Sequence, residues 1–336
     1  MNLLRRVFLK HSVASLAVLP FFTSTKSYAA PMASAKFVDV DGIRTSYFEG
    51  GSGEVMLLVH GGGFGSTSFA NNWRPIFDHL ASHFHVYALD KLGQGYTDNP
   101  RNDTDYSMEA VIRHVYRFLE TLGIEKVHLV GQSRGGLPVA RIATDHPELV
   151  ENLVIFNSRT LAPDDPTLPS RTTTTQTSEP ETPTKESIRQ SLLSSRTAYR
   201  KDHVTDDYVE AQFRIALLPK RKEAEEKMSL LTSRWVKLNA AKLEENPGLR
   251  NRWWYDEVKR ETFDRIKAGH LKSPTLIIWG TDDPSAPYTL ATNLYKVISS
   301  VVNRARLHFF NRCGHHAFAE YPEEVTRLMV DFIKDS

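Results

Sequence analysis

Short apolar runs along the chain alternate with stretches in which apolar residues recur at a helical period. The runs with the length of buried strands lie at 55–59, 86–89, 127–130, 153–156, 275–279 and 307–310. Before them, a β-hairpin is expected over 37–50, with Asp41-Gly42 as its turn. Strands that alternate with helices predict an α/β protein, with a mostly parallel sheet covered by helices on both faces.

The chain between the expected strands at 153–156 and 275–279 is far longer than an ordinary connection. An inserted lid is therefore predicted. Its first part, 164–185, is rich in Thr, Pro and Ser and is expected to be extended or disordered. Helical patterns follow at 186–195, 206–218 and 222–243.

These patterns divide the chain into parts. They predict a first core part at 36–163, a flexible linker with a helical lid at 164–265 and a second core part at 266–336. Within the lid, the charge run at 219–227 is interpreted as the solvated start of a helix.

Gly131-Gln132-Ser133-Arg134-Gly135 lies between the apolar run at 127–130 and a helical stretch at 137–143. A strand, a tight glycine turn and a helix in this order hold a serine exposed above a sheet. A serine hydroxyl becomes a nucleophile when a base accepts its proton and an acid orients that base. The motif therefore predicts Ser133 as the nucleophile of a serine hydrolase.

Two acids and two histidines follow the last two expected strands. Asp282 and Asp283 come first, and His315 and His316 follow. Loops after the strands are where open α/β sheets place their sites. We expect Asp283 and His315 to complete a catalytic triad with Ser133, and Asp282 and His316 are the alternatives.

His60-Gly61-Gly62-Gly63 ends the apolar run at 55–59. Glycines let the backbone approach a substrate oxygen that a side chain would block. The backbone amides of Gly62 and Arg134 are therefore the expected oxyanion hole.

Taken together, these motifs resemble those of the meta-cleavage-product, or carbon–carbon bond, hydrolases of the α/β-hydrolase superfamily. The resemblance implies an α/β-hydrolase fold, with a mostly parallel eight-stranded sheet, helices on both faces and an inserted helical lid. It covers most of the chain and rests on His60-Gly61-Gly62-Gly63-Phe64-Gly65, Asn72-Trp73-Arg74, Asp90-Lys91-Leu92-Gly93-Gln94-Gly95, Gly131-Gln132-Ser133-Arg134-Gly135-Gly136, Gly280-Thr281-Asp282-Asp283 and Gly314-His315.

Several positions depart from that family's pattern. Phe64 replaces a usual proline, Gln132 an asparagine and His316 a tryptophan. In the lid, Gln212 stands where the family carries an arginine for the substrate's carboxylate, and Arg214 follows two residues later. These departures and two lid tryptophans give the candidate substrate-binding residues: Phe64, Gln132, Gln212, Arg214, Trp253, Trp254 and His316.

The departures favour hydrolysis of a carboxylic ester or lactone of a small aromatic or apolar compound, through an acyl-enzyme. Carbon–carbon bond cleavage of a dienoate is the alternative, with Arg134 as a replacement cation. A non-catalytic, ligand-binding protein of the same fold is a third hypothesis.

Arg5-Arg6-Val7-Phe8-Leu9-Lys10 matches the twin-arginine export pattern. The apolar stretch that follows, at 12–22, is too short to span a bilayer. The sequence therefore predicts a signal peptide over 1–35, cleaved after Ala29 or Ala35. We expect the twin-arginine machinery to export the folded protein to the periplasm, without a stable membrane anchor.

Composition adds three expectations. The formal net charge of +2 indicates no nucleic-acid partner. The single cysteine, Cys313, rules out an internal disulfide and is interpreted as a packing residue. No metal-binding or phosphate-binding motif is present, so we expect a small-molecule substrate and neither metal nor cofactor. The sequence does not decide between a monomer and a homo-oligomer.

Overall fold

The computed structural model describes residues 34–165, 167–168, 182–193 and 199–335. The twin-arginine motif, the cleavage site at Ala29 and most of the Thr/Pro-rich linker lie outside these residues. The signal peptide and the conformation of the linker therefore stay predictions.

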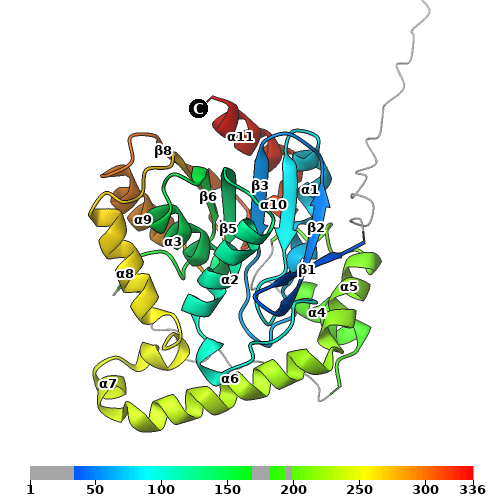
Figure 1. Cartoon of the computed structure of the whole chain (residues 1–336), viewed down its shortest axis with the longest axis vertical. Coiled ribbons are helices and arrows are strands. Elements are labelled where there is room, and N and C mark those ends of the chain that lie inside the picture. The colour runs from blue at the N-terminus through cyan, green and yellow to red at the C-terminus, as the bar shows by residue number, and fades with distance from the viewer. Residues whose placement is uncertain (1–33, 166, 169–181, 194–198, 336) are drawn as a thin grey trace, which may run out of the picture.

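A single sheet of eight strands forms the centre of the molecule (Figure 1). Its spatial order is β1-β2-β4-β3-β5-β6-β7-β8. The pairs β1–β2 and β2–β4 are antiparallel, and every other pair is parallel, which confirms the predicted architecture. The strands are β1 (Lys36–Val40), β2 (Ile43–Gly50), β3 (Val55–Val59), β4 (His85–Leu89), β5 (Val127–Gln132), β6 (Val150–Phe156), β7 (Thr275–Gly280) and β8 (Ala305–Phe310).

The two antiparallel strands at the edge form the expected hairpin. Asp41 and Gly42 have φ angles of +51° and +81°. Positive φ at both central residues matches the right-handed twist of paired strands, so this dipeptide sets the register of the hairpin.

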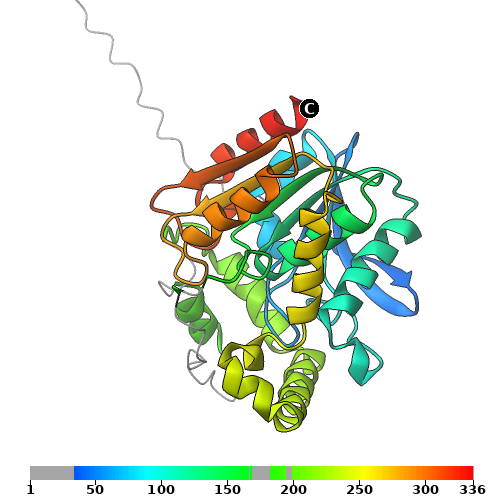
Figure 2. The same ribbon diagram turned by 90° about the vertical axis from the view of Figure 1, so that its left-hand side faces the viewer.

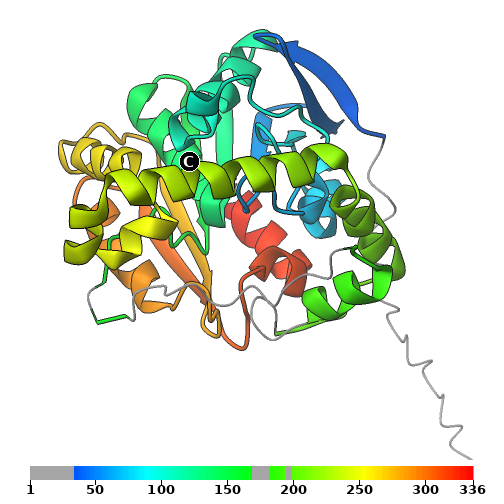
Figure 3. The same ribbon diagram turned by 90° about the horizontal axis from the view of Figure 1, so that it is seen from below.

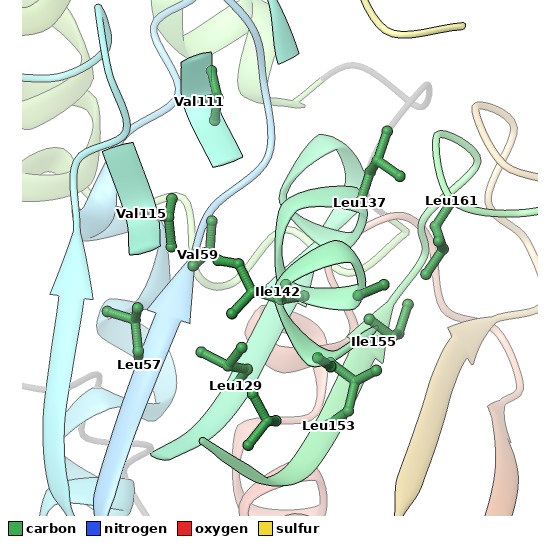
Figure 4. Close-up of a cluster of buried hydrophobic side chains, with 14 of the residues drawn as sticks. Leu57, Val59, Val111, Val115, Leu129, Leu137, Ile142, Leu153, Ile155 and Leu161 are labelled. Atoms are coloured by element: carbon green, nitrogen blue, oxygen red, sulfur yellow. The ribbon is translucent and has the colours of Figure 1, made fainter. Parts of the chain in front are cut away.

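Alternate strand residues divide the core into two layers. Leu57 and Val59 face one cluster, and Met56 and Leu58 face the other. Figure 4 shows part of the first cluster, between the sheet and its helices. That face carries α2 (Met108–Thr121), α3 (Gly136–Asp145), α8 (Asp256–Lys267) and α9 (Thr289–Ser299), and Figure 2 views the molecule from the side of α8. The opposite face carries α1 (Arg74–Ala81), α10 (Ala317–Glu320) and α11 (Pro322–Lys334).

The segment between β6 and β7 supplies the helices of the lid. They are α4 (Lys185–Leu193), α5 (Asp206–Ala216), α6 (Pro219–Leu238) and α7 (Ala240–Glu245). Seen from below in Figure 3, α6 runs across the ends of the strands. No helix in the described part of the chain is long and apolar enough to cross a membrane. The domain boundaries stay predictions.

The charge run at 219–227 forms the start of α6, and most of its charged side chains are exposed. Arg221 Nη1 donates to the carbonyl oxygen of Gly65 at 2.8 Å, in the loop after β3. Lys227 pairs with Asp103 at 2.8 Å, beyond β4. The prediction of a solvated helix start is therefore confirmed for most of the run, and Arg221 is an exception, because its side chain contacts the loop after β3.

Candidate active site

The turn after β5 presents Ser133. This serine has a φ of +53°, in the left-handed region that is strained for its side chain. A Cβ atom on Gly131 would lie 2.4 Å from the side chain of Val139. One on Gly135 would lie 2.2 Å from the carbonyl oxygen of Val59. Only glycine fits at both positions, so the motif packs the strand against α3 and leaves the serine at the apex.

Asp283 and His315 meet in a buried contact at the ends of β7 and β8. Asp283 Oδ2 lies 2.6 Å from His315 Nδ1, and the two residues are 3% and 9% exposed. Asp283 Oδ1 accepts from the amide and hydroxyl of Ser285, at 2.8 and 2.7 Å, and from the amide of Ala286 at 3.0 Å. Burial alone would raise the pKa of Asp283, but the charge and hydrogen bond of His315 hold it below its usual value. An ionised carboxylate in this place orients the imidazole.

The neighbouring alternatives take other positions. Asp282 is exposed and accepts a hydrogen bond from the hydroxyl of Thr281 at 2.9 Å. The ring of His316 lies edge-on to that of His315, with their centres 5.2 Å apart. The structure therefore places Asp283, rather than Asp282, against the imidazole of His315, with His316 beside it.

Asn157 is a site residue that the sequence analysis missed. It follows β6 and has a φ of +42°. Its Nδ2 donates to Asp283 Oδ2 at 2.8 Å and to the carbonyl oxygen of Gly314 at 3.4 Å. It thus holds Asp283 and the histidine loop together. Its position directly after a buried strand was the available signal.

Glu320 ties the histidine loop to the lid. Its carboxylate accepts from the amide of Gly314 at 2.8 Å, and from the amides of Tyr199 at 3.0 Å and Arg200 at 2.6 Å. Burial raises the pKa of Glu320, and these hydrogen bonds offset part of that effect. The sequence offered no local sign of this role.

The glycine loop after β3 lies against Ser133. Gly62 has a φ of +73°. A Cβ atom on Gly61 would lie 2.9 Å from Ser133 Cβ and 2.2 Å from Gln132 Oε1. Gln132 Nε2 also donates to the carbonyl oxygen of His315 at 3.3 Å. Gln132 therefore joins the glycine loop, the serine turn and the histidine loop, while the amides of Gly62 and Arg134 stay the predicted oxyanion donors.

An arginine and two aromatic rings gather at the same loop. A Cβ atom on Gly63 would lie 2.8 Å from Arg134 Nη1 and 3.4 Å from the indole of Trp254. Arg134 Cζ is 5.5 Å from the centre of the Trp254 ring, within the range of a cation–π contact. The rings of Phe64 and Trp254 are 5.9 Å apart. These three predicted side chains therefore form one cluster beside the glycine loop.

Two predicted lid residues differ in exposure. Gln212 is 3% exposed, and its Nε2 donates to Asn72 Oδ1 at 2.8 Å and to the hydroxyl of Tyr208 at 3.3 Å. The side chain of Arg214 is 68% exposed and pairs with Glu210 at 2.9 Å. The buried place in this helix is thus held by a neutral amide, and the arginine two residues on lies at the surface.

Trp253 packs within the lid. Its ring is stacked on that of Trp235, with the centres 6.2 Å apart. Its indole N–H donates to the hydroxyl of Thr232 at 3.0 Å. Its contacts are therefore with α6, unlike those of Trp254.

Known proteins of similar sequence include 2-hydroxy-6-oxo-6-(2'-aminophenyl)hexa-2,4-dienoic acid hydrolase of Metapseudomonas resinovorans. It is 28% identical over 306 residues, covering 89% of this chain and 90% of the relative. The 2-hydroxymuconate semialdehyde hydrolase of Pseudomonas sp. (strain CF600) is 29% identical over 303 residues, covering 88% and 92%. These relatives confirm the resemblance to meta-cleavage-product hydrolases.

Solved structures of hydrolases have a similar fold. A meta-cleavage product hydrolase from Pseudomonas fluorescens IP01 superposes with a TM-score of 0.65 at 26% identity, covering 89% of this chain and 97% of the other. A serine hydrolase involved in carbazole degradation gives a TM-score of 0.66 at 26% identity, covering 90% and 99%. The sequence pattern described as the alpha/beta hydrolase fold matches residues 54–322. The chain is therefore a hydrolase that belongs to the alpha/beta hydrolase fold family.

Proposed function

We propose that this hydrolase cleaves a carbon–carbon bond in a small vinylogous diketone, of the type formed from a 2-hydroxy-6-oxo dienoate. The carrying observation is the similarity, across nine-tenths of both chains, to a hydrolase named for such a dienoic acid. The relatives support this alternative better than the hydrolysis of an ester or lactone, which the sequence analysis favoured.

The arrangement of the loops supports a mechanism for this reaction. His315 accepts the proton of Ser133, whose Oγ attacks the carbonyl carbon next to the bond that breaks. The amides of Gly62 and Arg134 hold the oxyanion, and Asp283 stabilises the imidazolium. When the carbon–carbon bond breaks, its electron pair passes through the conjugated double bond to the second carbonyl oxygen, which takes the proton from His315. Water then hydrolyses the acyl-enzyme and frees the carboxylic acid.

Arg134 is the cation that we assign to the substrate's carboxylate. Gln212 is neutral and is engaged with Asn72, whereas Arg214 lies at the surface with Glu210. The guanidinium of Arg134 lies instead at the glycine loop, over Trp254. A dienoate would therefore place its carboxylate on the serine side of the site, away from the lid helix α5.

The test compares a 2-hydroxy-6-oxo dienoate with a neutral p-nitrophenyl ester. We expect dienoate turnover that Ser133→Ala abolishes. Arg134→Met keeps the backbone amide and removes the guanidinium, so KM for the dienoate should rise by about tenfold or more, the equivalent of a lost charge-assisted hydrogen bond. KM for the neutral ester should stay within about threefold in this variant. Arg214→Gln provides the comparison at a surface arginine.

Ester or lactone hydrolysis is the second candidate, and one observation favours it. The buried lid position carries Gln212, whose amide is already bonded to Asn72 and Tyr208. If kcat/KM for the ester exceeds that for the dienoate by about a hundredfold, this candidate replaces the first. Unchanged dienoate turnover in Ser133→Ala would remove both.

We further propose that the protein acts in the periplasm, after export through the twin-arginine machinery. Arg5-Arg6 and the short apolar stretch support this location. In a cell-fractionation experiment, the double substitution Arg5→Lys and Arg6→Lys should leave the protein in the cytoplasm. Equal periplasmic amounts of both forms would contradict export by this route.

A further inference from the structure

A buried lysine lies behind the glycine loop. Lys91 follows β4 and is 1% exposed. Its Nζ donates to the carbonyl oxygen of Gly62 at 3.0 Å. Its backbone N–H donates to His60 Nε2 at 3.2 Å, and His60 Nδ1 contacts the carbonyl oxygen of Gly61 at 2.7 Å. Lys91 thus holds this loop through both its side chain and its backbone.

The side chain of Lys91 is buried without an acidic partner in the part of the chain that the structure describes. Within the described residues, its Nζ forms no ion pair with a carboxylate. The adjacent Asp90 accepts instead from the amides of Ala70 at 2.7 Å and Tyr96 at 2.9 Å. Burial, and then the charge of Arg134, lower the pKa of Lys91 well below its usual value.

Such a lysine is costly to keep. A buried charge without a partner destabilises a fold, and an apolar side chain of similar volume would avoid that cost. The carbonyl contacted belongs to the Gly62–Gly63 peptide, which directly follows the Gly61–Gly62 peptide whose N–H is the predicted oxyanion donor. The reaction itself supplies the negative charge that Lys91 lacks in the resting protein, because an oxyanion forms at this loop during each catalytic cycle.

We propose that Lys91 is a positioning residue of the oxyanion hole, which fixes the Gly62–Gly63 peptide and, once protonated, supplies a positive charge behind the developing oxyanion. This inference rests on the proposed serine mechanism, and it holds whichever bond is cleaved. It predicts that Lys91 acts on the tetrahedral state and leaves substrate binding largely unchanged.

The experiment uses the full mature chain and phenylboronic acid, which forms an anionic tetrahedral adduct with a serine nucleophile. In Lys91→Met, kcat for a p-nitrophenyl ester should fall by about tenfold to a hundredfold, less than for loss of a direct oxyanion donor. The Ki of the boronate should rise by a similar factor, while KM stays within about threefold. Lys91→Gln keeps an N–H donor without the charge and should give an intermediate loss.

Lys259→Met is the matched control. Lys259, on α8, is also buried, at 8% exposure, but its ammonium pairs with the carboxylate of Asp164 at 2.7 Å. Its loss should change the melting temperature without changing the ratio of Ki to KM.

Two results would overturn the inference. If Lys91→Met, or Lys91→Gln should the first fail to fold, binds the boronate within about threefold of wild type, Lys91 does not act on the oxyanion. If the boronate binds wild type and Ser133→Ala equally, the serine mechanism is wrong, and the inference about Lys91 is wrong as well. The first result leaves the proposed function intact, so the two failures are distinguishable.

Discussion

Replacing Glu320 by glutamine should loosen the histidine loop from the lid. The carboxylate accepts from three backbone amides, with Oε1 on Gly314 and Oε2 on Tyr199 and Arg200. A glutamine side chain can present only one oxygen, so its NH₂ group must face an amide that also donates. If the oxygen turns to the lid, the amide of Gly314 loses its acceptor, next to His315.

The expected loss of stability follows from the one backbone amide that Glu320→Gln leaves without an acceptor. One hydrogen bond to a charged acceptor contributes about 1.5–3 kcal/mol, so the free energy of unfolding should fall by about that amount at pH 7. Because the bond lost is one residue from His315, we expect kcat/KM to fall by at least about tenfold. Urea unfolding and ester or dienoate turnover measure the two effects. Glu323→Gln, at an exposed position of α11, is the matched control.

The pH dependence has a definite sign. Because burial raises the pKa of Glu320 in the folded protein, protonation of this carboxyl stabilises the fold; that contribution is complete below the unfolded value of about 4.3 and is lost as pH rises through the folded value, which leaves only the hydrogen bonds of the carboxylate. The stability of wild type relative to Glu320→Gln should therefore grow as the pH is lowered from 7. Equal stability of the two proteins at every pH, with unchanged turnover, would refute the reasoning.

Three further predictions concern the same loops. Asp283→Asn should lower kcat by about ten-thousandfold with little change in KM, because the imidazole of His315 loses its anionic partner; a loss below tenfold in steady-state kinetics would contradict this role. Asn157→Gly keeps a residue that tolerates the positive φ and removes the bond to Asp283, so urea unfolding should show a loss of about 1.5–3 kcal/mol; wild-type stability would show that this bond contributes nothing. Cys313 is fully buried and its thiol pKa is raised, chiefly by burial, so iodoacetamide should modify it only in unfolded protein, as mass spectrometry would record; rapid labelling of the native chain would contradict its burial.

The parts of the fold that follow from local pattern were predictable. The apolar run at 55–59 became β3 with the same bounds, and that at 86–89 became β4, which begins one residue earlier. The order of serine, acid and histidine placed Ser133, Asp283 and His315 on loops after strands because strand ends are visible in the sequence.

Contacts between distant segments were not predictable in the same way. Glu320 meets Tyr199 across 121 positions, and the charges at the start of α6 find carbonyl and carboxylate partners in loops far earlier in the chain. A carboxylate or an ammonium has the same local signature whether it faces water or a buried amide. Hydrophobic periodicity indicates which face of an element is buried, but it does not indicate which polar group from a distant segment lies against that face.

Asn157 and Asp283 follow the neighbouring strands β6 and β7, and the side chains of Asn157 and His315 both contact one oxygen of Asp283. Asn157 Nδ2 is 2.8 Å from the same Oδ2 that lies 2.6 Å from the imidazole. Aspartate and asparagine have nearly the same shape, so exchanging them between the two loops would preserve the volume and the net charge. The loops after β6 and β7 thus offer two positions for the acid that contacts His315, and an evolving lineage could move the acid from one loop to the other by two substitutions.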